Sequence, residues 1–100
     1  MPKKAQTPAA TLVLDGDLDV FSIHGQWERF RPLLAATGGE VVLDLSGLGD
    51  LDMSGVQLLH ALDRDLRGQG ASLVLRGAQA GWKDRFGPLG LGDIFSGADA

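Results

Sequence analysis

Three carboxylates and a hydroxyl follow one another closely in the middle of the chain. Asp44, Asp50 and Asp52 precede Ser54, and Gly55 comes next. A serine at the start of a helix can carry a phosphate, because the free backbone N–H groups and the helix dipole favour negative charge there. Asp and Ser are also the usual helix caps. The pattern by itself therefore leaves two interpretations of Ser54, a modification site and a cap.

A modification site of this kind must be held in place by regular secondary structure. The sequence predicts a strand before Ser54 and a helix after it. The apolar run Val41–Leu45 predicts a buried strand. A helix over Gly55–Leu66 is predicted by apolar residues at three- and four-residue spacing, namely Val56, Leu59, Leu62 and Leu66. The joint between them is Asp52-Met53-Ser54-Gly55. We expect the strand to run into a short acidic loop that ends on Ser54 and offers its hydroxyl to solvent.

The first part of the chain predicts a strand and a helix. Residues Thr11–Val20 alternate apolar and polar side chains, with Gly16 as a bend or bulge. Ser22 is the expected N-cap of a helix whose apolar stripe consists of Ile23, Trp27, Phe30 and Leu34. Pro32 removes an intrahelical hydrogen bond, so we expect a kink or a break near Glu28–Arg31. We assign Trp27 and Phe30 to the core.

The last part of the chain repeats the alternation of strand and helix. Gly68 and Gly70 stop the preceding helix, Leu73–Leu75 predicts a short buried strand, and Gln79–Phe86 predicts a final helix. A strand, a helix and a strand in this order favour a parallel pair joined by a right-handed crossover. The pattern predicts a single α/β domain over residues 11–100, preceded by a flexible arm over residues 1–10.

Composition argues against several classes of protein. The chain of 100 residues has a net charge of −4 and its nine basic residues are scattered, so we expect no nucleic-acid binding. It has no cysteine, and therefore no disulfide framework or thiolate metal site. No segment approaches the ~20 apolar residues of a membrane span, and the first residues lack the apolar core of a signal peptide. We expect a cytoplasmic protein that does not insert into a membrane.

Catalytic and metal-binding interpretations are weaker than a regulatory one. The three aspartates could hold magnesium or accept a phosphoryl group, but no lysine or threonine partner follows at a suitable spacing. His24 and His60 lie far apart without a cysteine partner. Gly87–Gly92 lacks the glycine motifs that bind phosphates. We therefore expect no catalytic residue, no metal site, no cofactor and no ATP binding, with an aspartate-based phosphatase or phosphotransferase as the enzymatic alternative.

Three segments along the chain form a series: LDGDLD at Leu14–Asp19, VVLDLSGLGDLDMSG at Val41–Gly55 and LGLGDIF at Leu89–Phe95. In order and spacing they resemble the STAS family, the sulfate transporter and anti-sigma factor antagonist domains, over about Thr11–Phe95. The resemblance implies an α/β fold built on a mixed β-sheet of about four strands, with helices packed mainly on one face.

The resemblance also implies a function for Ser54. In the family's anti-sigma factor antagonists, a partner serine kinase phosphorylates the serine just before the glycine, which is Ser54 here by position. Met53 departs from the family's double serine and leaves one hydroxyl. The implied function is a phosphorylatable protein–protein interaction switch whose partner is an anti-sigma factor with kinase activity. The expected partner surface comprises Asp50, Leu51, Asp52, Met53, Ser54, Gly55, Gln57 and Leu58.

A second function stays open. STAS domains that this chain resembles are also constitutive accessory subunits of ABC-type lipid transporters or parts of chemotaxis-type signalling complexes, with an ATPase subunit as a partner. The Ser54 hydroxyl is then part of a permanent contact. Leu51 and Met53 flank the serine in both cases, either as apolar contacts or, in the plainer interpretation, as core residues.

Overall fold

The computed structural model describes residues 8–89 and 93–95, and it alternates strands with helices. The strands are β1 (Ala10–Leu18), β2 (Glu40–Leu51) and β3 (Ser72–Arg76). The α-helices are α1 (Ile23–Phe30), α2 (Met53–Gly68) and α3 (Trp82–Phe86). Short 3₁₀ helices occupy Arg31–Ala35, Gly87–Leu89 and Asp93–Phe95. The order confirms the predicted α/β class. None of the helices in these residues is long and apolar enough to span a membrane.

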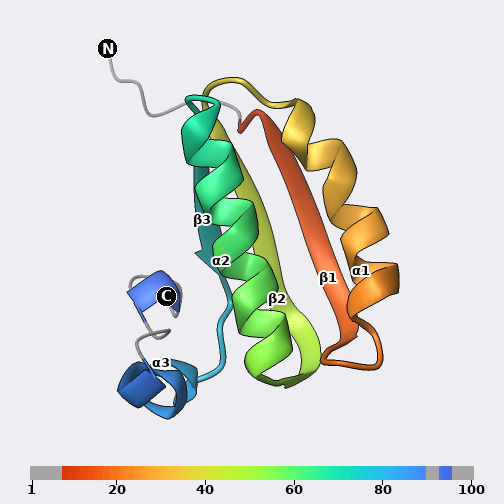
Figure 1. Ribbon diagram of the computed structural model, residues 1–100, viewed down its shortest axis with the longest axis vertical. Coiled ribbons are helices and arrows are strands. Elements are labelled where there is room, and N and C mark those ends of the chain that lie inside the picture. The colour runs from red at the N-terminus through yellow and green to blue at the C-terminus, as the bar shows by residue number, and fades with distance from the viewer. Residues whose placement is uncertain (1–7, 90–92, 96–100) are drawn as a thin grey trace.

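The described strands form one parallel sheet in the order β1-β2-β3 (Figure 1). Leu12 pairs with Leu43, and Leu43 pairs with Leu75, so β2 is the central strand. α1 connects β1 to β2, and α2 connects β2 to β3. Helical connections of this kind are what parallel neighbours require. The expected sheet was mixed and had about four strands, whereas the described residues contain three strands, all parallel.

The side chains of β2 divide the sheet into a covered face and an open face. Val41, Leu43 and Leu45 have no exposed surface and belong to the core, whereas Asp44 is half-buried and Ser46 is exposed on the other side. Figure 1 shows α1 and α2 lying over the same face of the sheet. The predicted stripe of α2 completes this core with the fully buried Val56, Leu59, Leu62 and Leu66. The helices therefore pack mainly on one face, as expected.

β1 is irregular at Gly16, where the sequence predicted a bend or bulge. Gly16 has a φ of +76°, a conformation that favours glycine. The pairing register with β2 shifts on both sides of it, between Val13 and Asp15 and between Gly16 and Leu18. At each shift β1 advances by two residues while β2 advances by three, so the extra residues lie in β2. The end of β1 lies beside the start of α2, because the Asp52 N–H donates to the Leu18 carbonyl oxygen at 3.3 Å.

The turn after β1 is held by the side chains of Asp19 and Ser22, and Ser22 does not cap α1 as predicted. Asp19 Oδ1 accepts hydrogen bonds from the N–H groups of Phe21 at 3.0 Å and Ser22 at 2.9 Å. Ser22 occupies the N-cap position of α1 without capping it, because its hydroxyl donates to the carbonyl oxygen of Asp17 at 2.7 Å. This turn ends β1 before Val20, the last residue of the predicted strand.

β2 is longer than predicted. The residues that were expected to form an acidic loop before Ser54 belong to this strand as far as Leu51. The ladder with β1 continues as far as the pair Leu18–Leu51. Leu48 and Leu51 on this extension are buried in the core. The residues between them are Gly and Asp, which are depleted in strands, so the local sequence does not indicate a strand here. The chain leaves the sheet only at Asp52, directly before α2.

Pro32 breaks the first helix where the sequence predicted a break. α1 ends at Phe30, and the chain continues as a 3₁₀ helix. Phe30 is fully buried, which confirms its core assignment, while Trp27 is half-buried and packs against the core. Gln26 ties α1 to the end of β1, because its side-chain amide donates to two carbonyl oxygens there, at 3.0 and 2.9 Å.

The C-terminal part packs through aromatic side chains. α3 begins at Trp82, later than the predicted Gln79. The Phe95 ring centroid lies 5.7 Å from that of Trp82 and 6.3 Å from that of Phe86, and all three residues are buried. Residues 90–92 of the expected closing turn and residues 1–7 of the expected arm lie outside the described residues.

Candidate functional site

Asp52 fixes the start of α2. Its backbone is extended, with φ −117° and ψ −175°, which is typical of a helix N-cap. Its Oδ1 accepts a hydrogen bond from the Gly55 N–H at 3.1 Å, and its carbonyl oxygen accepts one from the Val56 N–H at 3.0 Å. A cap of this kind contributes about 1 kcal/mol. The helix begins at Met53, before the predicted Gly55, so Ser54 lies within its first turn.

The Ser54 hydroxyl has no partner in the part of the chain that the structure describes. The side chain is half-buried, and it forms no hydrogen bond with any residue that the structure describes. The cap interpretation of Ser54 is therefore wrong, because Asp52 occupies the cap. The first N–H groups of a helix lack intrahelical partners, and the dipole places partial positive charge beside them. A phosphate on Ser54 would meet both of these favourable features.

The Asp52 carboxylate also joins α2 to the turn after β1. Its Oδ2 accepts a hydrogen bond from the Val20 N–H at 3.0 Å, so its two oxygens serve two elements. Behind it, α2 approaches β1 closely at Gly55. A Cβ added there would collide with the Leu18 carbonyl oxygen and lie 2.9 Å from Leu51 Cδ1. Close packing of helix on strand therefore requires the glycine that follows Ser54.

Three other carboxylates meet beside this joint. Asp17 and Asp19 at the end of β1 and Asp50 at the end of β2 each place an oxygen within 4.8 Å of the others. Oxygen ligands of this type suit hard cations such as Mg²⁺ and Ca²⁺. Two of these side chains already accept hydrogen bonds, since Asp17 Oδ1 takes the Asp50 N–H at 2.8 Å and Asp19 Oδ1 takes the N–H groups of the turn. Their observed role is to brace the turn against β2.

Asp44 lies outside this cluster, so the structure does not assemble the three aspartates that the sequence suggested for magnesium. It lies on the open face of the sheet, where its Oδ1 accepts hydrogen bonds from the Ser46 hydroxyl at 2.6 Å and the Ser46 N–H at 2.9 Å. These bonds, aided by the charge of Arg76, lower the pKa of Asp44 from 3.8 because they favour the ionised form. Asp44 is a structural carboxylate of β2.

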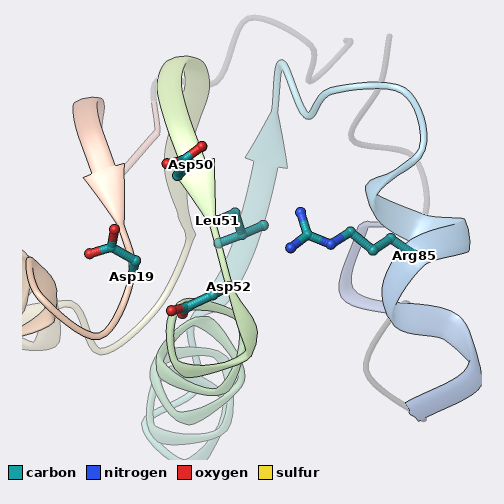
Figure 2. A pocket seen from close by; sticks show the side chains of 5 residues that line it. All are labelled: Asp19, Asp50, Leu51, Asp52 and Arg85. Carbon is teal, nitrogen blue, oxygen red and sulfur yellow. The ribbon is translucent and has the colours of Figure 1, made fainter.

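A groove of about 320 Å³ opens beside the start of α2 (Figure 2). Its lining residues are Asp19, Asp50, Leu51, Asp52 and Arg85. Figure 2 shows Arg85 extending from α3 toward Leu51, with the three carboxylates on the side of the sheet and α2. Leu51 is only 2% exposed and provides an apolar floor. The groove therefore has an acidic wall and a guanidinium group opposite it.

The expected partner surface separates into accessible and buried residues. Its exposed or half-buried members are Asp50, Asp52, Met53, Ser54, Gln57 and Leu58. Leu51 and Gly55 are buried, and Leu51 belongs to the core, as the plainer interpretation had it. Met53 is 42% exposed, so it is not an ordinary core residue.

The sequence interpretation missed two apolar side chains beside this surface. Phe21 is 94% exposed and Val20 is 58% exposed. Both lie in the turn that Asp52 holds through the Val20 N–H. Asp19 and Ser22 on either side are typical turn residues, and this signal could have placed the intervening pair in a solvent-facing turn. Extending the predicted strand to Val20 concealed it.

Comparison with known protein families finds a match over most of the chain. A family model described as "Mlab, STAS domain" matches residues 3–96. The matched range includes the whole of the sheet, α2 with its Asp52 cap, and α3. A search of curated proteins gives no match.

Proposed function

The chain belongs to the STAS domain family, whose members are generally non-enzymatic binding or regulatory domains, and we propose that it is a cytoplasmic interaction switch of the anti-sigma factor antagonist type. In this proposal a partner serine kinase phosphorylates Ser54. The observation that carries it is the unused Ser54 hydroxyl in the first turn of α2, where Asp52 already caps the helix. The modification can therefore occur without removing a contact on which the fold depends.

The added phosphate should change recognition rather than the fold. It brings nearly two negative charges, and the helix N-terminus favours such charge by about 0.3–1 kcal/mol. A charged partner group about 6 Å away, at an effective dielectric constant near 20, would feel roughly 3 kcal/mol per unit charge. Since about 1.4 kcal/mol is a tenfold change in affinity, one charge contact changes partner binding about a hundredfold. Its sign depends on the charge of the partner group that faces Ser54.

The chain acts in this proposal as the phosphate acceptor and not as a catalyst. The kinase brings the nucleotide and magnesium, so the chain requires no cofactor or metal of its own. Two features support this assignment. Asp44 is separate from the Ser54 joint, and one oxygen each of Asp17 and Asp19 is engaged by backbone N–H groups. An aspartate nucleophile would need a carboxylate directed at substrate rather than one that braces a turn.

A second candidate is a constitutive accessory subunit of an ABC-type lipid transporter or a chemotaxis-type complex. One observation favours it, the exposure of Met53 at the partner surface. Met53 replaces a family serine and is 42% exposed at the start of α2. Exposed methionine is common at protein-binding surfaces, because its flexible side chain adapts to a partner. A permanent apolar contact needs no modification.

Affinity capture from the native organism can distinguish the two functions. The baits are the wild-type protein, Ser54→Ala and Ser54→Asp, with Ser72→Asp as a control that adds the same charge at an exposed serine of β3. For a switch we expect phosphate on Ser54 by mass spectrometry, and a difference in partner recovery of at least about tenfold between the Ala and Asp forms.

The other outcomes are equally informative. The same partner at equal yield on all four baits, with Ser54 unmodified in cells, would establish the accessory subunit instead. A change with Ser72→Asp as large as that with Ser54→Asp would show that the effect is one of total charge and would remove support for both proposals at this surface.

A further inference from the structure

The turn after β1 and the start of α2 form one continuous surface. The Val20 N–H donates to Asp52 Oδ2 at 3.0 Å, and Met53 follows Asp52 directly. Figure 1 shows this turn and the start of α2 at the same end of the molecule. Three apolar side chains are exposed here: Val20 at 58%, Phe21 at 94% and Met53 at 42%. We call Val20, Phe21 and Met53 the apolar tip.

The apolar tip contributes little to folding. A ring that is 94% exposed gains almost nothing from the hydrophobic effect within the chain. Apolar side chains that gather on a surface instead of scattering singly are typical of interaction sites. Aromatic residues are also the commonest anchors of protein interfaces, since they bury a large rigid surface. The placement of Phe21 is therefore more useful for binding than for stability.

Negative charge lies beside the apolar tip, in the groove that Arg85 lines from α3. Asp17, Asp19 and Asp50 have oxygens within 4.8 Å of one another, and Asp52 lines the same groove as Asp19 and Asp50. The like charges repel one another, so a cation placed among them is attracted by all of them. We call Asp17, Asp19 and Asp50 the acidic cluster. Apolar and acidic features side by side are complementary to a segment that carries both apolar and basic side chains.

We propose that the apolar tip and the acidic cluster together bind a protein segment in which an aromatic or large aliphatic side chain lies next to Lys or Arg. The proposal names the chemistry of the partner and rests on the proposed function, in that the partner approaches at the start of α2. The apolar side chain packs on Phe21 and Met53. The basic side chain reaches the acidic cluster, where the Asp50 carboxylate accepts no hydrogen bond from the described residues.

Charge argues against two other occupants. An anionic membrane would be repelled by the acidic cluster, although an exposed Phe can insert into lipid. A second copy of the chain would bring the two acidic clusters together, and its net charge of −4 adds to the repulsion. A basic partner segment meets neither obstacle, and its association should be faster at low salt.

A random linear-peptide library displayed on phage tests this inference on the full-length protein. We expect the selected peptides to combine Phe, Trp, Leu or Met with neighbouring Lys or Arg. The affinity of a selected synthetic peptide is then measured by fluorescence anisotropy. It should fall by about tenfold or more with Phe21→Ser, and severalfold with Asp50→Asn or when NaCl is raised from about 50 to about 500 mM.

The chain offers a matched control for each change. Val13→Ser removes another exposed apolar side chain, 55% exposed, from β1, on the face of the sheet opposite the core. Asp65→Asn removes an exposed carboxylate from a later turn of α2. Both controls should leave the affinity unchanged within about twofold. Circular dichroism of every variant confirms that it is folded.

Several results would overturn the inference. These are selected peptides without basic residues, an equal loss of affinity with Val13→Ser and Phe21→Ser, or no selected peptide at all. Phe21-dependent flotation with vesicles of phosphatidylcholine and phosphatidylglycerol would assign the surface to a membrane. A dimer in sedimentation that Phe21→Ser abolishes would assign it to a second copy.

The switch itself is decided separately by Ser54→Asp. A phosphate on Ser54 adds negative charge, which attracts a basic segment. It also adds bulk beside Met53, which obstructs an apolar side chain. The peptide affinity of Ser54→Asp measures the net result of these two effects. Equal peptide affinity of wild type and Ser54→Asp, with the Phe21→Ser loss intact, would leave the peptide site standing and count against the switch. Phosphate on Ser54 in cells, together with a phage library that yields no peptide, would support the switch and count against the peptide site.

Discussion

The Asp52 carboxylate and the Val20 N–H lie 3.0 Å apart, although 32 positions separate them in sequence. The other oxygen of this carboxylate caps α2 through the Gly55 N–H at 3.1 Å. One side chain therefore determines both where the helix begins and where the turn after β1 lies. The placement of Ser54 relative to Phe21 depends on this residue.

Replacing Asp52 with Ala should lower the free energy of unfolding by about 1–2 kcal/mol, because it removes a cap and a second backbone contact. Asp52→Asn keeps one acceptor oxygen and should lose less. Urea denaturation measures both changes. Asp50→Asn is the matched control, since the Asp50 side chain accepts no hydrogen bond from the described residues. Equal losses for Asp52→Ala and Asp50→Asn would contradict the joining role.

Replacing Gly55 with Ala should destabilise the domain by about 1–3 kcal/mol, because the added methyl group collides with the Leu18 carbonyl oxygen and overpacks the interface. Gly68 is a control within the same helix, with nothing within 4 Å of an added Cβ. Gly68→Ala should be neutral or should stabilise by up to about 1 kcal/mol. Thermal or urea melts report both. Loss of stability in both variants would point to helix geometry instead of the close approach.

Replacing Ser54 with Ala should change stability by less than about 0.5 kcal/mol, since no described residue depends on its hydroxyl. Ser54→Asp should stabilise by about 0.3–1 kcal/mol through the helix dipole, with less effect at high salt. Ser22→Ala is the contrasting variant and should cost about 1 kcal/mol, because that hydroxyl donates to the Asp17 carbonyl oxygen at 2.7 Å. A loss above about 2 kcal/mol for Ser54→Ala would identify Ser54 as structural.

Replacing Ser46 with Ala should raise the pKa of Asp44 toward 3.8, because the Ser46 hydroxyl is the largest cause of its lowering. The ionised carboxylate is the form that these hydrogen bonds stabilise. That stabilisation is present above pH 3.8, the unperturbed value, and is lost as the pH falls through the lowered pKa of the folded state. An NMR titration of the Asp44 side-chain carboxyl carbon measures the shift. Ser72→Ala should leave the titration unchanged, and an unchanged titration with Ser46→Ala would contradict the assignment.

Local chemistry in the sequence was enough for much of the fold. The spacing of Val56, Leu59, Leu62 and Leu66 predicted the buried face of α2, and Pro32 predicted the break after α1. The alternation of strand and helix predicted parallel crossovers. These features depend on residues within a few positions of one another, because helix periodicity, proline geometry and apolar runs are local properties.

Only the tertiary structure decided the details of the site. The extension of β2 to Leu51 relies on pairing with Leu18, and the Asp and Gly residues along it do not indicate a strand. The choice of Asp52 over Ser54 as the cap, and the exposure of Phe21, depend on contacts between the turn after β1 and the start of α2. Hydrogen bonds between distant segments are set by how the chain packs, and a local pattern carries no record of its distant partner.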